Sequence, residues 1–153
     1  MIELTLPYPI SNNRYKAPRI VRGSFITWYL TPEAKAYKAE VILRATLAGL
    51  RQPFPGRVSV HMQLYPKRPQ DWERRVRKDP LNWDDDVQSM DLDNARKVLL
   101  DALNGVAYVD DRWIWRDSAE RMEPDGEARV VVTISPIVRA SPQASLIEEA
   151  TPA

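Results

Sequence analysis

The sequence predicts one compact α/β (α+β) domain with a mixed β-sheet and two main helices. Its 153 residues are the size of one ordinary domain. Hydrophobic residues make up 44% of the chain and charged residues 28%, a balance that is typical of a globular protein folding in water. Strand-like and helix-like patterns follow one another without strict alternation, which favours a mixed sheet over a purely parallel one.

Four segments have the pattern of a β-strand. They are residues 2–6, 57–65, 113–122 and 127–134. The last two are joined at Pro124-Asp125-Gly126, a turn signal that is typical of a hairpin. Apolar residues around Gly23 predict a bent strand or hairpin over residues 19–30.

Two segments have the pattern of a main helix. Thr31-Pro32 predicts the start of the first, because Thr is a good N-cap and Pro does not need the N–H it lacks at the first helical position. This helix is expected to run to about residue 48, where Gly49 can end it. Apolar residues at helical spacing between 92 and 106 predict the second, with Gly105 in the position of a C′ glycine.

Two further segments lack regular periodicity. Residues 7–13 are expected to form a loop, since they are rich in Pro, Ser and Asn. Residues 66–90 are polar and irregular, and a segment of this length in a small domain is usually functional or disordered. We therefore interpret residues 1–136 as one domain with a long inserted loop at 66–90. Residues 137–153, rich in Pro, Ser, Ala and Glu, are expected to form a flexible tail.

Composition excludes several kinds of site. Cysteine is absent and His61 is the only histidine, so disulfides, zinc–thiolate sites and multi-histidine sites are ruled out, and His61 itself is interpreted as structural. Metal ligands would be carboxylates, which favours hard ions such as Mg²⁺ or Mn²⁺. Because signal-peptide features and long apolar stretches are missing, a cytoplasmic protein is expected.

The charges are unevenly distributed although their sum is only +1. Basic residues gather over 14–22 and 67–78, and an acidic run follows over 79–93. Basic arms beside an acidic cluster suit an enzyme that holds a polyanion and places a metal ion at the cut. For any single run, a solvated loop is the alternative.

Asp91, Asp93 and Lys97 form the most informative motif. Residues i and i+2 of an extended segment point the same way, so both carboxylates can face one cation where the chain enters the helix. Lys97 follows Asp93 by four residues on the same helix face, where it can reach a phosphate. A purely structural alternative fits the same spacing, with Asp91 as N-cap and an ordinary Asp93–Lys97 salt bridge.

A further acidic pair, Asp110-Asp111, follows the apolar run of residues 106–109. If that run pairs into the sheet, it returns these carboxylates to the start of the second helix. Three carboxylates and a lysine suit a phosphodiesterase, because a metal ion activates water and offsets charge on the phosphate while lysine adds a positive charge.

Three motifs, in matching order and spacing, resemble the RusA family of Holliday junction resolvases. Thr5-Leu-Pro-Tyr-Pro-Ile-Ser-Asn-Asn-Arg-Tyr15 resembles its N-terminal strand and Pro-x-Pro-x-Ser-x-Asn loop. Asp91-Leu-Asp-Asn-Ala-Arg-Lys97, followed by Leu100-Asp-Ala-Leu-Asn-Gly105, resembles its central helix. Tyr108-Val-Asp-Asp111 resembles its closing acidic pair. The resemblance covers residues 2–65 and 91–134.

The resemblance implies a crossover junction endodeoxyribonuclease of DNA recombination and repair. Such an enzyme works as a homodimer with Mg²⁺ or Mn²⁺ and cuts four-way junctions by paired symmetric nicks that leave 5′-phosphates. Asp91, Asp93 and Asp111 would bind the metal, Lys97 would be essential, and Asp110 is a neighbouring acid of less defined role. The family occurs in bacteria, their phages and prophages, which agrees with a cytoplasmic protein.

The chain departs from the family between Tyr65 and Asp91, where the usual linker is short and basic, and this puts junction specificity in question. Trp72 and Trp83 in this segment are expected to pack it onto the body, with stacking on unpaired bases as the alternative. Local turns or solvated loops are the alternative for the residues that we expect to contact DNA. These are Asn12, Asn13, Arg14, Lys67, Arg68, Arg74, Arg75, Arg77 and Lys78.

Two other classes of protein remain open: a branched-DNA-binding protein that does not cut, and a nuclease that acts on flaps or forks. The intact set of Asp91, Asp93, Lys97 and Asp111 argues against the first. The aromatic-rich stretches 25–30 and 106–115 exceed what one small core absorbs, so we predict that part of them lies in a homodimer interface. Trp28, Trp113 and Trp115 are accordingly assigned to the core or to that interface.

Overall fold

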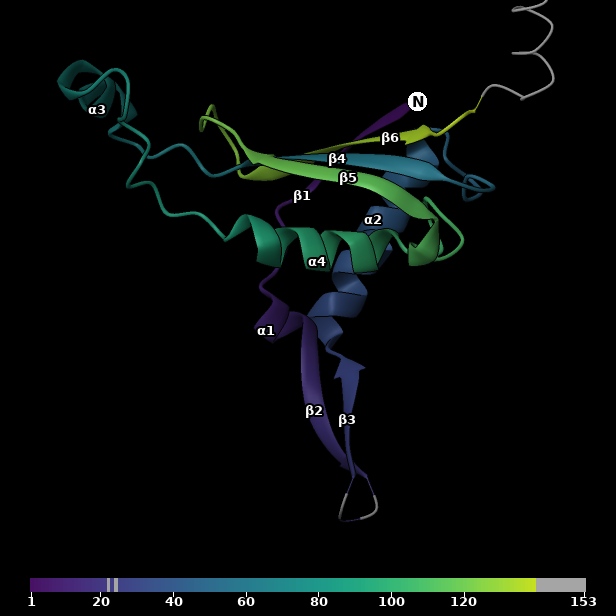
Figure 1. Ribbon diagram of the computed structural model, residues 1–153. Coiled ribbons are helices and arrows are strands. Elements are labelled where there is room, and N and C mark those ends of the chain that lie inside the picture. Colours follow the sequence, from purple (N-terminus) through teal and green to yellow (C-terminus); the bar gives the residue numbers. More distant parts are fainter. Residues whose placement is uncertain (22, 24, 140–153) are drawn as a thin grey trace, which may run out of the picture.

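The computed structural model describes residues 1–21, 23 and 25–139. Its main sheet contains β1 (Ile2–Pro7), β4 (Val58–Tyr65), β5 (Ile114–Arg121) and β6 (Arg129–Pro136). Their order across the sheet is β1-β6-β4-β5. β6 is antiparallel to both of its neighbours, whereas β4 and β5 are parallel. The α+β class with a mixed sheet is therefore confirmed (Figure 1).

Two helices, α2 (Pro32–Leu47) and α4 (Leu92–Leu103), cover one face of this sheet (Figure 1). α2 packs on β1, α4 packs on β4 and β5, and the two helices contact each other. The apolar side of β4 is buried beneath them, as its alternation predicts. The buried residues that α4 contributes to the core are Ala95, Val98, Leu99, Ala102 and Leu103.

Both main helices begin and end where local signals place them. Thr31 Oγ1 accepts a hydrogen bond from Ala34 N (3.2 Å), and Pro32 occupies the first helical position. Gly49 follows α2 with φ 97°, a left-handed conformation that glycine adopts without a Cβ penalty. The residues expected to form a loop at 7–13 differ in one respect, since a short helix, α1 (Asn12–Tyr15), begins there.

The prediction of a hairpin between β5 and β6 is wrong. Both strands exist, but β4 lies between them, so the turn at Pro124-Asp125-Gly126 carries the chain past β4. Two adjacent parallel strands need a crossover connection, and α4 forms the one between β4 and β5. The whole acidic motif therefore lies within this crossover.

A separate two-stranded antiparallel sheet consists of β2 (Lys16–Val21) and β3 (Phe25–Leu30). This confirms the hairpin predicted around Gly23, which projects away from the main sheet (Figure 1). Its apolar side chains are largely uncovered, with Trp28 66% exposed. Trp115 on β5 is also exposed, and Trp113 is half-buried. Of the two places predicted for these residues, the core is therefore wrong for Trp28 and Trp115.

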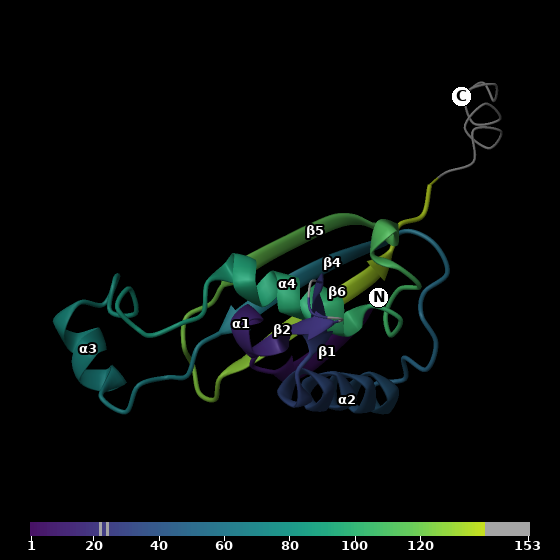
Figure 2. The ribbon, with the colours of Figure 1, turned by 90° about the horizontal axis from the view of Figure 1, so that it is seen from below.

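The 66–90 segment is more ordered than the irregular loop that its sequence predicts. It contains α3 (Trp72–Lys78), which two arms hold away from the sheet (Figure 2). Trp83 packs onto the body as expected: it is buried, and its Nε1 donates to Glu123 Oε1 (2.7 Å). Trp72 instead lies under the guanidinium of Arg68, 4.3 Å from the ring centre.

The segment after β6 contacts the body at its start. Ile137 N donates to Arg57 O (2.9 Å), and the Arg139 guanidinium lies 5.5 Å from the ring centre of Trp115. Residues 140–153, the rest of the predicted flexible tail, lie outside the described residues. None of the described helices has the length and apolar character needed to cross a membrane.

Candidate active site

Asp91 and Asp93 lie where the chain enters α4. Asp91 occupies the N-cap position, yet within the described structure its side chain makes no capping hydrogen bond, so the N-cap alternative lacks its defining contact. Asp93 Oδ2 lies 3.0 Å from Lys97 Nζ, and Asp93 Oδ1 lies 3.4 Å from Arg96 Nη2. The hydrogen bond from Lys97, followed by its charge, lowers the pKa of Asp93, which therefore stays ionised at neutral pH.

Asp110 and Asp111 form a second acidic pair at the short 3₁₀ helix η1 (Asp111–Trp113). Arg112 N donates to Asp110 Oδ1 (3.0 Å), which lowers the pKa of Asp110. The hydrogen bond with Asp110 and its negative charge raise the pKa of Asp111. Two carboxyls this close compete for one proton, and a divalent cation would relieve the same repulsion.

The run of residues 106–109 does not return Asp111 to the start of α4. It forms no strand; buried Tyr108 makes only isolated bridges, to Phe54 and Asn104. Asp111 consequently lies beside the middle and end of α4, in a cleft of about 390 Å³ that also contains Lys97. We call this the acid cleft, lined by Asn12, Tyr15, Lys16, Arg96, Lys97, Leu100, Asp101, Asn104, Asp111 and Ile114.

The carboxylates stand as two separate pairs. Among the residues described, no three Asp, Glu or His side chains lie close enough together to hold a metal ion. Lys97 links the pairs, because it bonds Asp93 and lines the cleft of Asp111. Each pair offers carboxylate oxygens on exposed side chains, the ligand type of a hard divalent cation, but three of them could share one ion only after the two pairs approach each other. Metal binding by these residues stays a prediction.

A groove of about 1270 Å³ runs between the 66–90 segment and residues 8–11 and reaches Asp91. Its lining includes four basic residues that we predicted to contact DNA: Arg14, Lys67, Arg68 and Arg75. Met90 N donates to the Tyr8 hydroxyl (2.7 Å), so the two walls are joined close to Asp91. We call this the insert groove, and its position fits a channel for a polyanion that leads toward the acids.

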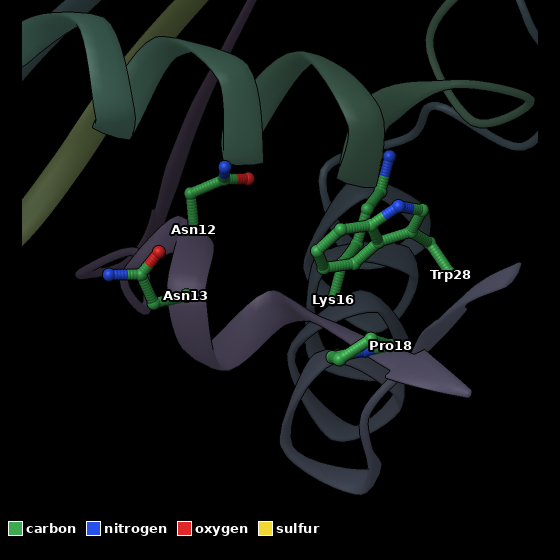
Figure 3. Close-up of a pocket in the computed structure, with 5 residues that line it drawn as sticks. All are labelled: Asn12, Asn13, Lys16, Pro18 and Trp28. Atoms are coloured by element: carbon green, nitrogen blue, oxygen red, sulfur yellow. The ribbon is translucent and has the colours of Figure 1, made fainter. Parts of the chain in front are cut away.

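The other predicted DNA contacts lie outside the insert groove. Arg74 and Lys78 line a second pocket, which shares Arg75 and Asp86 with the insert groove. Arg74 pairs there with Asp71 (3.0 Å), and Arg77 is exposed on α3. Asn12 and Asn13 lie at a cavity beside the hairpin (Figure 3). Its other lining residues are Lys16, Pro18 and Trp28. Figure 3 shows Asn12 pointing toward α4, in keeping with its place in the acid cleft as well.

The acid cleft contains residues that the sequence analysis did not assign to the site, among them Asp101, Arg96 and Tyr15. Asp101 had a signal, because it follows Lys97 by four residues and so shares its helix face. Arg96 Nη1 donates to Asp117 Oδ2 on β5 (2.7 Å), a contact that fixes α4 on the sheet. Tyr15 ends the N-terminal motif, but nothing in that motif assigns it to the site, since the packing of α1 against α4 brings it to the cleft.

His61 lies on β4, between two side chains of the neighbouring strand β5. Its Nδ1 is 2.6 Å from Ser118 Oγ and its Nε2 is 3.1 Å from Glu120 Oε1. Hydrogen bonds from Gln63 and then His61 lower the pKa of Glu120. These cross-strand contacts support the structural role expected for His61, which does not line the acid cleft.

The chain matches one known protein family. Residues 7–135 match the family described as Endodeoxyribonuclease RusA. No curated protein gave a significant match. The matched range includes the 66–90 segment, all of α4 and the Asp110-Asp111 pair, and hence every residue of the acid cleft and of the insert groove. Because the match spans most of the chain, the protein belongs to the RusA endodeoxyribonuclease family.

Proposed function

We propose that the protein is a Mg²⁺-dependent endonuclease that resolves Holliday junctions by paired symmetric nicks, leaving 5′-phosphates, in DNA recombination and repair. Membership in the RusA family supports an endodeoxyribonuclease that acts on branched DNA. The single observation that carries the proposal is the position of Lys97. It bonds Asp93 at the start of α4 and lines the same cleft as Asp111, so a phosphate in the cleft meets an ammonium group that lies between acids from two segments.

Asp91, Asp93 and Asp111 would hold the Mg²⁺ ion, with Mn²⁺ as a substitute and Asp110 as an accessory ligand. When bound, the ion would supply an activated water and offset charge on the phosphate. The competition between Asp110 and Asp111 for one proton supports this assignment, because such a pair gains most from a cation. Asp91, whose side chain makes no capping bond among the residues described, keeps its oxygens available.

The protein's own cations bind and orient the substrate. Lys97 places its ammonium beside the developing negative charge of the phosphate, where a fixed point charge favours the transition state. The insert groove guides the DNA backbone toward Asp91 through Arg14, Lys67, Arg68 and Arg75. Asn12 holds the phosphate from the opposite wall of the acid cleft.

A homodimer would supply two such sites for the two nicks. The β2–β3 hairpin supports this part of the proposal, because an isolated two-stranded sheet is marginally stable in water and this one exposes several large apolar side chains. They are Ile20, Phe25, Ile26, Trp28 and Tyr29. The enzyme would act in the bacterial cytoplasm, and a phage or prophage would be one source of its gene.

A nuclease that acts on flaps or forks is the second candidate. The insert groove favours it specifically, because a groove of this kind on one side of the acids suits a single strand or arm. A branched-DNA-binding protein that does not cut would have no use for Lys97 bonded to Asp93 beside Asp111.

One cleavage assay separates these functions. A four-way junction, a fork, a flap and a linear duplex of the same sequence are each incubated with the protein in Mg²⁺ and in EDTA. We expect paired, symmetric nicks in the junction that require Mg²⁺ and carry 5′-phosphates. Preferred cutting of the flap or fork would support the second candidate, and binding without cutting in Mg²⁺ or Mn²⁺ would refute an endonuclease.

A further inference from the structure

Tyr15 lies beneath the acid cleft with an unused hydroxyl. The residue is only 1% exposed and lines the cleft beside α4. Its Oη is the one buried side-chain polar atom, among the residues described, that has no hydrogen-bond partner. A buried hydroxyl without a partner destabilises the folded state, so most such groups are paired unless they serve another purpose. The position of this one, at the cleft of Lys97 and Asp111, suggests that purpose.

Asp101 is the nearest candidate to receive this hydroxyl. Burial first, and then the neighbouring Asp101, raise the pKa of Tyr15 far above its ordinary value, so the phenol stays protonated and acts as a donor. The Oη atom is itself sealed from solvent, which means that it cannot touch DNA directly. Asp101, by contrast, is half-buried and lines the cleft. Asp101 is therefore the cleft residue through which the Tyr15 hydroxyl can act on the reaction.

Asp101 in turn lies one helical turn after Lys97. Residues 93, 97 and 101 follow one another at intervals of four, so Lys97 has a carboxylate on each side along one face of α4. The ammonium has three donors, and Asp93 accepts one of them at 3.0 Å. If the Asp93 oxygens turn to a metal ion, Lys97 loses its ion pair with Asp93. The Lys97 ammonium would then lack a partner that orients it during the reaction. Asp101 is the second anchor on the same face.

We propose that Asp101, held by the Tyr15 hydroxyl, is a positioning residue that keeps Lys97 aimed at the scissile phosphate. One Asp101 oxygen accepts from Tyr15 Oη and the other accepts from Lys97 Nζ, whose remaining protons face the phosphate. The inference rests on the proposed function, because it assigns a task to the Lys97 of that site. It adds two residues that belong neither to the metal ligands nor to the DNA contacts.

The test compares two buried tyrosines. Tyr15→Phe and Asp101→Asn are measured beside Tyr37→Phe, a matched control that is buried too but donates its hydroxyl to Pro7 O (2.9 Å). The readouts are the single-turnover cutting rate of the substrate that the wild type cuts best, the Kd for that DNA in Ca²⁺, and the Tm. We expect Tyr15→Phe and Asp101→Asn to cut about 10-fold or more slowly, with Kd unchanged, since misplacing a catalytic group slows the chemical step.

The Tm separates a loss of activity from a loss of folding. Tyr15→Phe and Tyr37→Phe each remove one buried hydroxyl, so Tyr15→Phe should lower Tm no more than Tyr37→Phe does. Tyr37→Phe should lower Tm and leave the rate unchanged, because it removes a hydrogen bond away from the cleft. In a Lys97→Ala background, followed over hours with excess enzyme, Asp101→Asn should cause no further loss of rate.

Each failure has a distinct pattern. If the wild type cuts but Tyr15→Phe and Asp101→Asn cut at its rate, the positioning role is wrong and the proposed function stands. The positioning role is also wrong if Tyr37→Phe slows cutting as much as Tyr15→Phe does, or if Asp101→Asn slows the Lys97→Ala protein by the same factor as it slows the wild type. If the wild type cuts no DNA in Mg²⁺ or Mn²⁺, the proposed function fails, and this inference fails with it.

Discussion

Asp93 holds two cations at once, Lys97 and Arg96, through ion pairs on an exposed helix face. Exposed pairs of this kind contribute little to stability because water screens them. The neighbours of Asp93 lower its pKa, and removing its carboxylate should not unfold the protein. A loss of activity in an Asp93 variant can therefore be attributed to function and not to folding. Asp91 can also be replaced without loss of a described contact, because it is exposed and its side chain makes no capping hydrogen bond among the described residues.

Asp93→Asn and Asp91→Asn should each reduce cutting at least about 100-fold, because the neutral amide is a poor ligand for a hard cation. Junction affinity should change little, since it depends on the basic residues. Gel-based cleavage and fluorescence binding measure the two effects. Asp85→Asn, an exposed acid of the 66–90 segment, is the control and should cut normally. Normal cutting by Asp93→Asn in Mg²⁺ would remove it from the site.

Lys97→Ala should reduce the single-turnover rate by roughly 10²–10³-fold, the usual range for losing one preorganised charge at a reacting centre. Binding should weaken far less, because one of many cations is lost. Lys35→Ala, on the exposed side of α2, serves as a control for charge alone. A Lys97→Ala protein that binds weakly but cuts at the normal rate once saturated would make Lys97 a binding residue only.

At the scale of elements, the 66–90 segment divides its own cations. Lys67 and Arg68 line the insert groove, and Arg74 and Lys78 line a second pocket. Arg75 lines both and pairs with Asp71 (2.9 Å). Trp83 and the contact from Arg121 to Val87 O (2.8 Å) fix the returning arm to the body. The groove is thus held in place from two sides rather than formed by a free loop.

Two triple variants of equal charge test this division. Replacing Lys67, Arg68 and Arg75 by Ala should weaken junction binding and reduce the slope of log K against log salt by about 3, one unit for each lost phosphate contact. Replacing Arg74, Arg77 and Lys78 by Ala should change the slope by less than half as much. Titrations at several salt concentrations measure both. Equal slopes for the two variants would show that the groove has no special share in binding.

Sequence reasoning succeeded where a signal and its effect are neighbours in the chain. The Thr31-Pro32 cap and the alternation over β4 are of this kind. It failed at Pro124-Asp125-Gly126, because a turn signal reports a bend and not which strand lies alongside. α3 was missed because its seven residues are mostly charged and show no apolar stripe. The place of Asp111 depends on how Tyr108 packs, which no local pattern reports.

At the scale of the whole molecule, the β2–β3 hairpin is the part whose apolar side chains a single chain leaves uncovered. β2 and β3 pair only with each other in the described structure, and Phe25 and Trp28 are each about two-thirds exposed. Burying apolar surface of this kind contributes roughly 25 cal/mol per Å². A second copy that covers the hairpin would also bring a second acid cleft to the same junction.

Light scattering at micromolar concentration should therefore give about twice the 17.6 kDa monomer mass, with and without DNA. The double variant Phe25→Ser and Trp28→Ser should shift the mass toward the monomer and uncouple the two nicks, so that nicked junctions accumulate. Leu81→Ser, an exposed apolar residue of the 66–90 segment, should stay dimeric. A wild-type mass of 17.6 kDa in both conditions would argue for single nicking, as in a flap nuclease.

The crossover between β4 and β5 gives this scaffold a form of modularity. The 66–90 segment leaves the sheet at the end of β4 and rejoins the chain just before α4, so its length is not set by any strand pairing. Each doubling of such a loop costs only about 0.6 kcal/mol in closure entropy. The stretch between the anchored residues Arg68 and Trp83 can therefore be shortened, extended or exchanged while the sheet and α4 stay as they are. In a chimaera, substrate choice would travel with the graft, and cutting chemistry would remain with the host.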